Sequence, residues 1–378
     1  MYSVHSYGRM LADAPRMDAY SAALRRAVTA GSVVLDVGCG PGVFALQACK
    51  LGARRVFAVE PDNAIQIARE AAMANGFADR IEFFQNLSTE ITLPERADVI
   101  ISDLRGVLPW YQQHIPSIID ARTRLLAPGG VLIPRRDILW AAIVEAPDRY
   151  QEIVGPWQSN GLDLSAGKRS VTNTWRKTRI DPDGLLVQPS CWARLDYHEI
   201  QSPDIRAEIE WQVDRFGTAH GLAVWFDSEL VDEIGFSNHP SGPELIYGNG
   251  FFPFSTPVEV VKGDRISVMI RADFIRDDYV WRWDTDFFAA VGSVPKASFK
   301  QSTFFGAPLS PEQMRKQAAT YRPVLDQRGE ARSFIMELMT GENSLAEIAE
   351  RVTERFPQRY ADSQDALNEV TAVSREFG

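Results

Sequence analysis

The stretch from Val33 to Glu60 constrains this chain more than any other part of the sequence. It begins with an apolar run typical of a buried parallel strand and then enters the turn Asp36-Val37-Gly38-Cys39-Gly40-Pro41-Gly42. A helix-like segment follows, and a second apolar run ends in Glu60. The glycines allow a ligand to approach the backbone closely, and an acidic residue after the second strand can accept hydrogen bonds from two ribose hydroxyls. The stretch therefore predicts a nucleoside-binding βαβ unit.

The glycine spacing indicates which kind of nucleoside is bound. A dinucleotide turn has the pattern Gly-x-Gly-x-x-Gly, whereas the three glycines here alternate with other residues and are followed by Val43-Phe44-Ala45. The pattern resembles the first motif of class I S-adenosylmethionine (AdoMet) methyltransferases. That resemblance implies AdoMet as the cofactor. It also implies a set of residues that hold it: Asp36, Gly38, Gly40, Gly42 and Glu60.

The pattern of predicted secondary structure changes twice along the chain. Strand and helix signals alternate up to residue 133, which predicts a doubly wound α/β sheet. Residues 134–300 contain short runs in which aromatic and polar residues alternate, so we expect an antiparallel β-barrel domain there, with Trp281-Arg282-Trp283-Asp284 in its wall. Residues 308–378 predict a small helical domain, with a winged helix as one form that it could take. We take residues 1–133 as the AdoMet-binding domain.

Composition excludes several classes of function. The net charge of −10 argues against a nucleic-acid partner. The three cysteines form no disulfide framework, and no other potential metal ligands lie near them at a suitable spacing. We therefore expect a cytoplasmic protein and no metal site. No signal peptide is apparent, and no apolar run reaches the roughly 18 residues of a membrane span.

The order of these domains resembles that of the protein arginine methyltransferases, over residues 2–287. The fourth-strand run Ala97–Ser102, the run Leu125–Gly130 before Ile133-Pro134, and the barrel segment His220–Phe226 resemble family signatures. The resemblance implies methyl transfer to arginine in a peptide or protein. Residues 157–181 occupy the place of the family's dimerisation arm, which implies a head-to-tail homodimer.

The same resemblance assigns further residues to the cofactor. Met10 lies in a segment like the helix that covers AdoMet, and Arg16 falls where an arginine grips the AdoMet carboxylate, a task suited to a guanidinium. Ser88 and Thr89 follow the third strand, where the family has a residue pair that contacts adenine.

The chain departs from the family in the loop that holds the acceptor. Arginine methyltransferases bind the substrate guanidinium between two glutamates, and the matching positions here are Asp103 and Gln112. Arg105 adds a positive charge within this loop, and Leu245-Ile246-Tyr247 replaces the family's Thr-His-Trp motif. We take Asp103 and Gln112 as the candidate catalytic residues. His114, one turn further on, is either a general base or a structural histidine.

The C-terminal helices resemble PqqD-like domains, which bind the leader peptide of ribosomally made, modified peptides. The resemblance rests on Arg332–Gly341 and Ser344–Ala349, about fifty residues in all with their surroundings. It implies a leader peptide or another protein as a partner, and a purely structural extension is the alternative.

Taken together, the sequence predicts an AdoMet-dependent N-methyltransferase that acts on a peptide or protein, with arginine as the first choice of acceptor. Two alternatives stay open. One is a methyltransferase for a small molecule, such as free arginine or a biosynthetic intermediate. The other is an inactive scaffold that binds AdoMet and recruits a partner.

Overall fold

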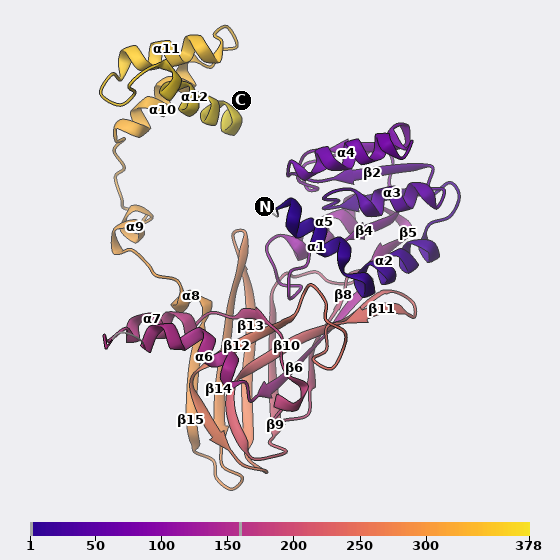
Figure 1. Ribbon diagram of the computed structural model, residues 1–378, viewed down its shortest axis with the longest axis vertical. Coiled ribbons are helices and arrows are strands. Elements are labelled where there is room, and N and C mark those ends of the chain that lie inside the picture. The colour runs from indigo at the N-terminus through magenta and orange to yellow at the C-terminus, as the bar shows by residue number, and fades with distance from the viewer. Residues whose placement is uncertain (1–2, 159–160) are drawn as a thin grey trace. The chain divides into compact units, whose positions relative to one another are not determined.

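The computed structural model describes residues 3–158 and 161–378 (Figure 1). Tyr2, where the family resemblance begins, and residues 159–160 of the expected arm lie outside the described residues. Contacts along the chain divide it into two units, Met1–Pro308 and Leu309–Gly378, and each is considered by itself. No helix among the described residues is both long and apolar enough to span a bilayer.

Two helices precede the first sheet, α1 (Val4–Ala12) and α2 (Ala14–Ala27). Each begins at a residue whose side chain accepts a backbone N–H, because the first turn of a helix leaves its N–H groups without partners. Ser3 accepts from the Ser6 N–H, and Asp13 accepts from the Arg16 N–H. Asp13 therefore fixes the point at which the chain turns from α1 into α2.

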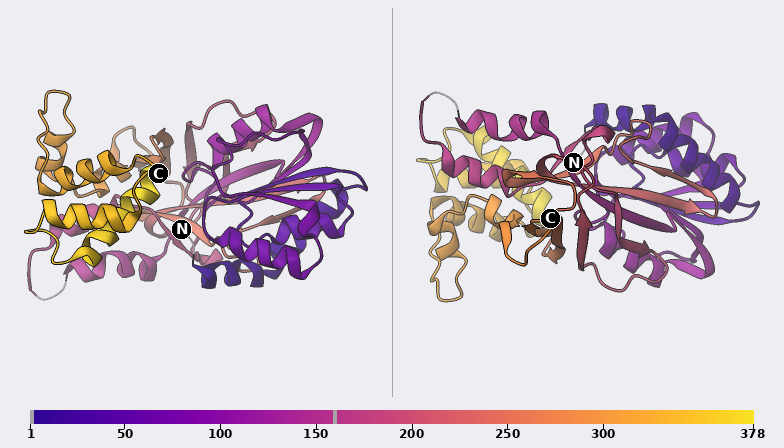
Figure 2. Two further views of the ribbon diagram at one scale, coloured as in Figure 1. Left: turned by 90° about the horizontal axis from the view of Figure 1, so that it is seen from above. Right: turned by 90° about the horizontal axis from the view of Figure 1, so that it is seen from below.

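The first sheet is parallel and five-stranded, with the order β3-β2-β1-β4-β5. Its strands are β1 (Val33–Val37), β2 (Arg55–Val59), β3 (Ile81–Phe84), β4 (Ala97–Ser102) and β5 (Leu126–Ile133). The helical segments between them are α3 (Val43–Lys50), α4 (Ala64–Ala74), η1 (Ala78–Arg80) and α5 (His114–Arg124). Helices lie on both faces of this sheet (Figure 2). The strand order reverses between β1 and β4, which is where sheets of this kind bind ligands, at the carboxyl ends of the strands.

The second part of this unit consists of two antiparallel sheets. One has the order β7-β12-β10-β6-β8 with β11 paired to β10, and the other has the order β15-β14-β13-β9. Their strands are β6 (Arg136–Val144), β7 (Arg176–Thr178), β8 (Ser190–Asp196), β9 (Ile205–Gln212), β10 (Gly217–Val231), β11 (Ile234–Ser237), β12 (Asn249–Val260), β13 (Arg265–Ile275), β14 (Asp278–Phe288) and β15 (Pro295–Ser302). Trp281 and Trp283 are fully buried while Arg282 is exposed, so the expected alternation in this wall is confirmed.

The segment expected to form the arm contains both helix and strand. Its helix is α7 (Ser165–Thr172), and the segment begins within η2 (Gly155–Gln158). Helix α6 (Pro147–Val154) precedes the segment and η3 (Pro182–Gly184) follows it, while α8 (Thr303–Gly306) follows the last strand. Strand β7 lies within residues 157–181 and pairs with β12, so the C-terminal part of this range belongs to a sheet.

The second unit is helical. It contains α9 (Pro311–Lys316), α10 (Gln327–Leu338), α11 (Leu345–Arg355) and α12 (Ser363–Phe377), and its described residues include no strand. Ile335, Ile348 and Val370, one from each of the last three helices, are almost completely buried together. The unit is therefore a three-helix core rather than a winged helix.

Candidate active site

The turn after β1 brings the backbone close to a cavity. Gly38 and Gly40 have φ angles of 75° and 50°, the left-handed region that favours glycine. A Cβ atom on Gly38 would lie 2.3 Å from a methyl carbon of Leu104, and one on Gly40 would lie 2.7 Å from the ring of Tyr7. The positive φ angles favour glycine at these two positions, and both glycines line the cavity.

Glu60 follows β2 and closes the turn from the other side. One carboxylate oxygen accepts the Gly40 N–H at 3.0 Å, and the other accepts the Asp62 N–H at 3.0 Å. Burial raises the pKa of Glu60, although these two N–H groups oppose the shift. The carboxylate lines the cavity with its remaining acceptor capacity.

Asp36 acts on the protein backbone instead. Its carboxylate accepts the N–H of Ala45 in the first turn of α3 at 3.0 Å, and the side chain does not line the cavity. Burial raises the pKa of Asp36 to about 7, with the Ala45 N–H opposing the shift and the Glu60 charge adding to it.

The raised pKa of Asp36 predicts a pH dependence of stability. The folded state keeps a proton on Asp36 that the unfolded chain releases, so the free energy of unfolding falls as the pH rises through the interval between the two pKa values. The Asp36→Asn variant has no proton to release at this position. Between roughly pH 5 and pH 7.5, the free energy of unfolding of the wild type should therefore fall by about 2–3 kcal/mol relative to that of the variant. Denaturant titrations at a series of pH values measure the difference. Parallel curves for the two proteins would show that Asp36 titrates normally.

The cavity has a volume of about 540 Å³. It lies at the carboxyl ends of β1, β2 and β4, where the strand order predicts a ligand. The predicted site residues that line it are Met10, Arg16, Gly38, Gly40, Glu60, Asp103 and Gln112. Those that do not line it are Asp36, Gly42, Ser88 and Thr89. Ser88 is buried and its carbonyl oxygen accepts from Arg124, while Thr89 is exposed.

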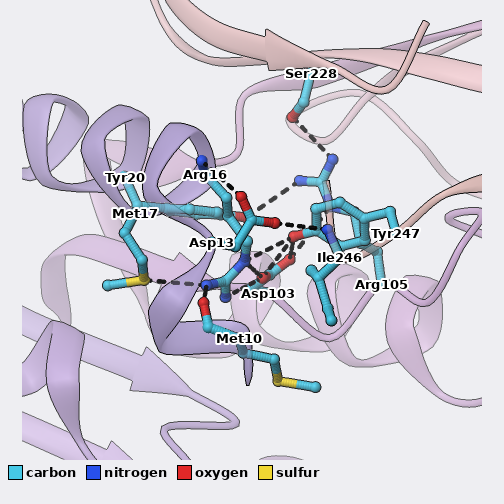
Figure 3. A network of polar contacts seen from close by, with 10 residues as sticks. All are labelled: Met10, Asp13, Arg16, Met17, Tyr20, Asp103, Arg105, Ser228, Ile246 and Tyr247. Carbon is cyan, nitrogen blue, oxygen red and sulfur yellow. Dashed lines mark hydrogen bonds and ion pairs between the residues drawn. The ribbon is translucent and has the colours of Figure 1, made fainter. Parts of the chain in front are cut away.

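Asp103, in the loop after β4, is the centre of a polar network (Figure 3). The Arg16 Nε donates to it at 2.8 Å, the Arg16 Nη2 also pairs with it, and the Tyr247 hydroxyl lies 2.7 Å and 2.8 Å from its two oxygens. Burial raises the pKa of Asp103, but the Arg16 and Arg105 charges outweigh this effect and hold the pKa below its ordinary value. Asp103 is therefore a carboxylate at neutral pH, with its charge compensated.

Arg105 is held deeper in the protein. Its Nη1 donates to Asp137 at 2.6 Å and to the Ser228 hydroxyl at 2.8 Å, and its Nε lies 3.5 Å from Asp103. The guanidinium also stacks over the rings of Phe226 and Phe236. Arg105 thus links the acceptor loop to β6 and β10 of the barrel.

His114 belongs to the same buried network. Its Nε2 lies 3.1 Å from the Tyr197 hydroxyl, which donates to Asp137 at 2.6 Å. Burial lowers the pKa of His114 to about 3, and the side chain does not line the cavity. Of the two interpretations of His114, the structure supports the structural one.

Gln112 lines the cavity and makes no hydrogen bond to the residues of the network within the part of the chain that the structure describes. It has a φ angle of 43°, its side chain is exposed, and its backbone N–H donates to Asp278 at 3.3 Å. Gln112 and Asp103 therefore come from the two ends of one loop and border the same cavity.

Sequence reasoning missed the role of Tyr247. Its hydroxyl contacts both Asp103 and the Arg16 Nε, although the three residues are far apart along the chain. The neighbouring Ile246 N–H donates to Asp13 at 2.7 Å, which ties this barrel loop to the junction of α1 and α2. The only signal in the sequence was the replacement of a family motif at these positions.

The architecture is a class I methyltransferase fold joined to a barrel domain. Residues 21–135 match the family described as "Ribosomal protein L11 methyltransferase (PrmA)", and residues 135–286 match "Arginine methyltransferase oligomerization subdomain". The two ranges together are similar to the protein arginine methyltransferases, and the expected fold class is confirmed.

Individual relatives show the same similarity. Probable protein arginine N-methyltransferase 6 of Arabidopsis thaliana is 30% identical over 242 residues, which are 60% of this chain and 56% of that protein. Protein arginine N-methyltransferase 1 of Dictyostelium discoideum is 26% identical over 275 residues, 70% of this chain and 80% of that protein. The chain spans little more than half the length of the first of these relatives.

Solved structures show the same fold. Protein arginine methyltransferase 10 of Arabidopsis thaliana superimposes with a TM-score of 0.70 at 24% identity, over 79% of this chain and 97% of that one. A Trypanosoma brucei PRMT1 enzyme–prozyme heterotetrameric complex with AdoHcy gives a TM-score of 0.71 at 23% identity, over 80% of this chain and 98% of that one.

Proposed function

We propose that this protein is an AdoMet-dependent N-methyltransferase whose acceptor is a peptide or protein, with arginine as the residue modified. The observation that carries the proposal is the cavity that joins the glycine turn and Glu60 to Asp103 and Gln112. A methyl donor and an acceptor nitrogen must meet in one place, and this cavity is lined by residues suited to each.

The residues around the turn fit AdoMet. Gly38 and Gly40 place the backbone in the wall of the cavity, Glu60 has acceptor capacity for ribose hydroxyls, and Arg16 can pair with a carboxylate. Met10 covers the same cavity from α1. AdoMet, when bound, supplies an activated methyl group on a sulfonium. The adenine contacts expected of Ser88 and Thr89 stay a proposal, and neither residue lines the cavity.

Arg16 would serve two purposes. Its Nε and Nη2 are engaged with Asp103, and its Nη1 donates to the Met10 carbonyl at 3.2 Å. A cofactor carboxylate can take the second Nη2 N–H, for which the structure gives no partner among the described residues, or replace one of these contacts. Such an exchange would leave more of the Asp103 charge for the acceptor.

Asp103 and Gln112 would orient the acceptor. The Asp103 carboxylate can accept a hydrogen bond from an N–H group of the arginine that is to be methylated. The Tyr247 hydroxyl fixes the orientation of that carboxylate. The Gln112 amide oxygen can accept a hydrogen bond from the remote end of the acceptor group. The protein's contribution is alignment and exclusion of water, which together can supply much of the acceleration of a displacement reaction.

The acceptor class can be tested with methyl-labelled AdoMet and a cell extract, resolved into protein and small-molecule fractions. We expect label in the protein fraction. Label among small molecules alone would replace the proposed acceptor with a metabolite, and no transfer at all would indicate a scaffold that binds AdoMet.

The proposed cofactor site makes a prediction for Glu60. Glu60→Ala removes charge-assisted hydrogen bonds to the ribose and should weaken AdoHcy binding by about 1.5–3 kcal/mol, or roughly 10- to 150-fold. Calorimetry measures the affinity. Glu82→Ala, an exposed glutamate of β3 that pairs with Arg55 and does not line the cavity, is the matched control. Equal affinities for the Glu60→Ala variant and the wild type would remove Glu60 from the cofactor site.

We also propose that the protein forms a homodimer through the arm. Leu162 of this segment is an apolar side chain with 66% of its surface exposed, and Trp157 is also partly exposed. Light scattering should give twice the mass of the chain for the wild type and a monomer for Leu162→Asp, because burying a charge in an apolar contact is unfavourable. Val291→Asp changes another exposed apolar residue, in the turn between β14 and β15, and should stay a dimer. A monomeric wild type would contradict the proposal.

The three-helix unit lies beyond both matched ranges. We keep as a proposal that it binds a leader peptide or another protein, and its resemblance to PqqD-like domains is the support for that role.

A further inference from the structure

A second cavity borders the first. Its volume is about 660 Å³, and it is lined by residues of β7 and of the barrel segment Asn238–Asn249. Arg9, Lys177 and Ile246 line both cavities. An acceptor that extends from Asp103 into the second cavity must therefore contact this shared wall.

The shared wall is cationic. Arg9 comes from α1 and Lys177 from β7, and both side chains are exposed. Over residues 3–158 and 161–378, neither of them forms an ion pair with a carboxylate. Partial burial and the nearby Arg9 charge lower the pKa of Lys177, although Glu244 and Asp13 oppose the shift. Two like charges held close together, neither of them ion-paired among the described residues, favour an incoming anion.

The carboxylates nearest this wall are already engaged. Asp13 accepts the N–H groups of Arg16 and Ile246, and Glu244 pairs with Arg179 at 3.1 Å. These contacts leave Arg9 and Lys177 as the cations without a matching carboxylate on this wall, within the part of the chain that the structure describes.

The position of Lys177 is fixed relative to the acceptor loop. Its ammonium group donates to the carbonyl oxygen of Ile246, and the next residue, Tyr247, contacts Asp103. An ammonium group has three donors, so two stay available to a ligand. Ile246 and Tyr247 thus connect Asp103, which is proposed to bind the substrate arginine, with the Lys177 cation in the adjoining cavity.

We propose that Arg9 and Lys177 form a carboxylate-binding subsite for the acceptor molecule. The protein then prefers an arginine that has a carboxylate close by, either an acidic neighbour in a peptide or the α-carboxylate of an amino acid. This inference rests on the proposed function, because it assumes that the acceptor reaches Asp103.

The test compares two synthetic peptides that contain one arginine and differ only in having aspartate or asparagine on both sides of it. With the full chain and AdoMet, we expect kcat/KM to be about tenfold higher for the aspartate peptide, with the preference weaker at high salt. Lys177→Gln and Arg9→Gln should each remove most of the preference. Arg176→Gln is the matched control, since Arg176 is the exposed neighbour of Lys177 and lines neither cavity.

Free arginine is the third substrate, and it separates the two sources of the carboxylate. Methylation of free arginine that needs Lys177, together with equal rates for the two peptides, would assign the subsite to the α-carboxylate. Preference between the peptides would assign it to an acidic side chain.

Fluorescence anisotropy measures the binding of the same two peptides without turnover. For this measurement the peptides are dye-labelled and mixed with the AdoHcy-loaded protein. If no arginine is methylated but the aspartate peptide still binds more tightly, in a manner that needs Lys177, the proposed function fails and the subsite stands. If wild type, Lys177→Gln and Arg176→Gln treat both peptides and free arginine alike in rate and in binding, the subsite is wrong.

Discussion

Replacing Asp103 with asparagine should reduce methyl transfer by roughly 100-fold or more, the range expected when a group that orients or accepts a reacting proton is removed. The amide keeps the size of the side chain and still accepts from Tyr247, but it loses the charge that the acceptor nitrogen requires. AdoHcy affinity should stay within a few-fold of the wild-type value, because the change releases Arg16 from its ion pair rather than removing it. Paired kinetics and calorimetry on the variant measure both effects.

Asp120→Asn is the matched control for that variant. Asp120 is also paired with an arginine, Arg124, but lies on α5 away from the cavity, so its loss should leave turnover unchanged. Normal turnover by Asp103→Asn would show that Asp103 only anchors Arg16. A large loss of AdoHcy affinity would show that the Arg16–Asp103 pair is part of the cofactor site.

Replacing Arg105 with methionine should destabilise the first unit by about 3–5 kcal/mol. The Arg105 and Asp137 side chains are both completely buried, so the substitution leaves a carboxylate without its counterion inside the protein. Among the residues that the structure describes, Asp137 would keep the Tyr197 hydroxyl as its one side-chain partner, and that partner is neutral. Denaturant unfolding followed by tryptophan fluorescence measures the change, since all nine tryptophans lie between residues 110 and 283.

A second substitution distinguishes an unpaired charge from simple loss of packing. Arg105→Met combined with Asp137→Asn removes both charges and should recover a large part of the lost stability, because the cost comes mainly from the isolated carboxylate. A loss below about 1 kcal/mol for Arg105→Met alone would mean that water reaches Asp137 in solution.

The parts of the site that could be predicted from sequence are those made by neighbouring residues. The turn at Gly38 and Gly40 and the acidic residue Glu60 lie within one βαβ unit, so their spacing specifies their geometry. The alternation of Trp281 and Trp283 with charged residues is equally local, because successive side chains of a strand point to opposite faces, and it is sufficient to indicate a barrel wall.

The contacts that could not be predicted join distant segments. Family resemblance gave Arg16 and Asp103 separate roles, but nothing in the sequence showed that they pair with each other or that Tyr247 joins them. The sequence placed Ser88 and Thr89 in the turn after the third strand, but it did not specify how that turn is oriented. The orientation decides which side chains line the cavity. Strand β7 was missed within the expected arm because three residues are too few to show an alternating pattern.

The central claim is that this cavity transfers a methyl group to arginine in a peptide. The most direct measurement is mass spectrometry of an arginine peptide after incubation with deuteromethyl-AdoMet and the full chain, followed by acid hydrolysis and amino-acid analysis. The account predicts labelled methylarginine that depends on Asp103. Unmodified arginine from a protein that binds AdoHcy normally, or label on a different residue, would contradict it.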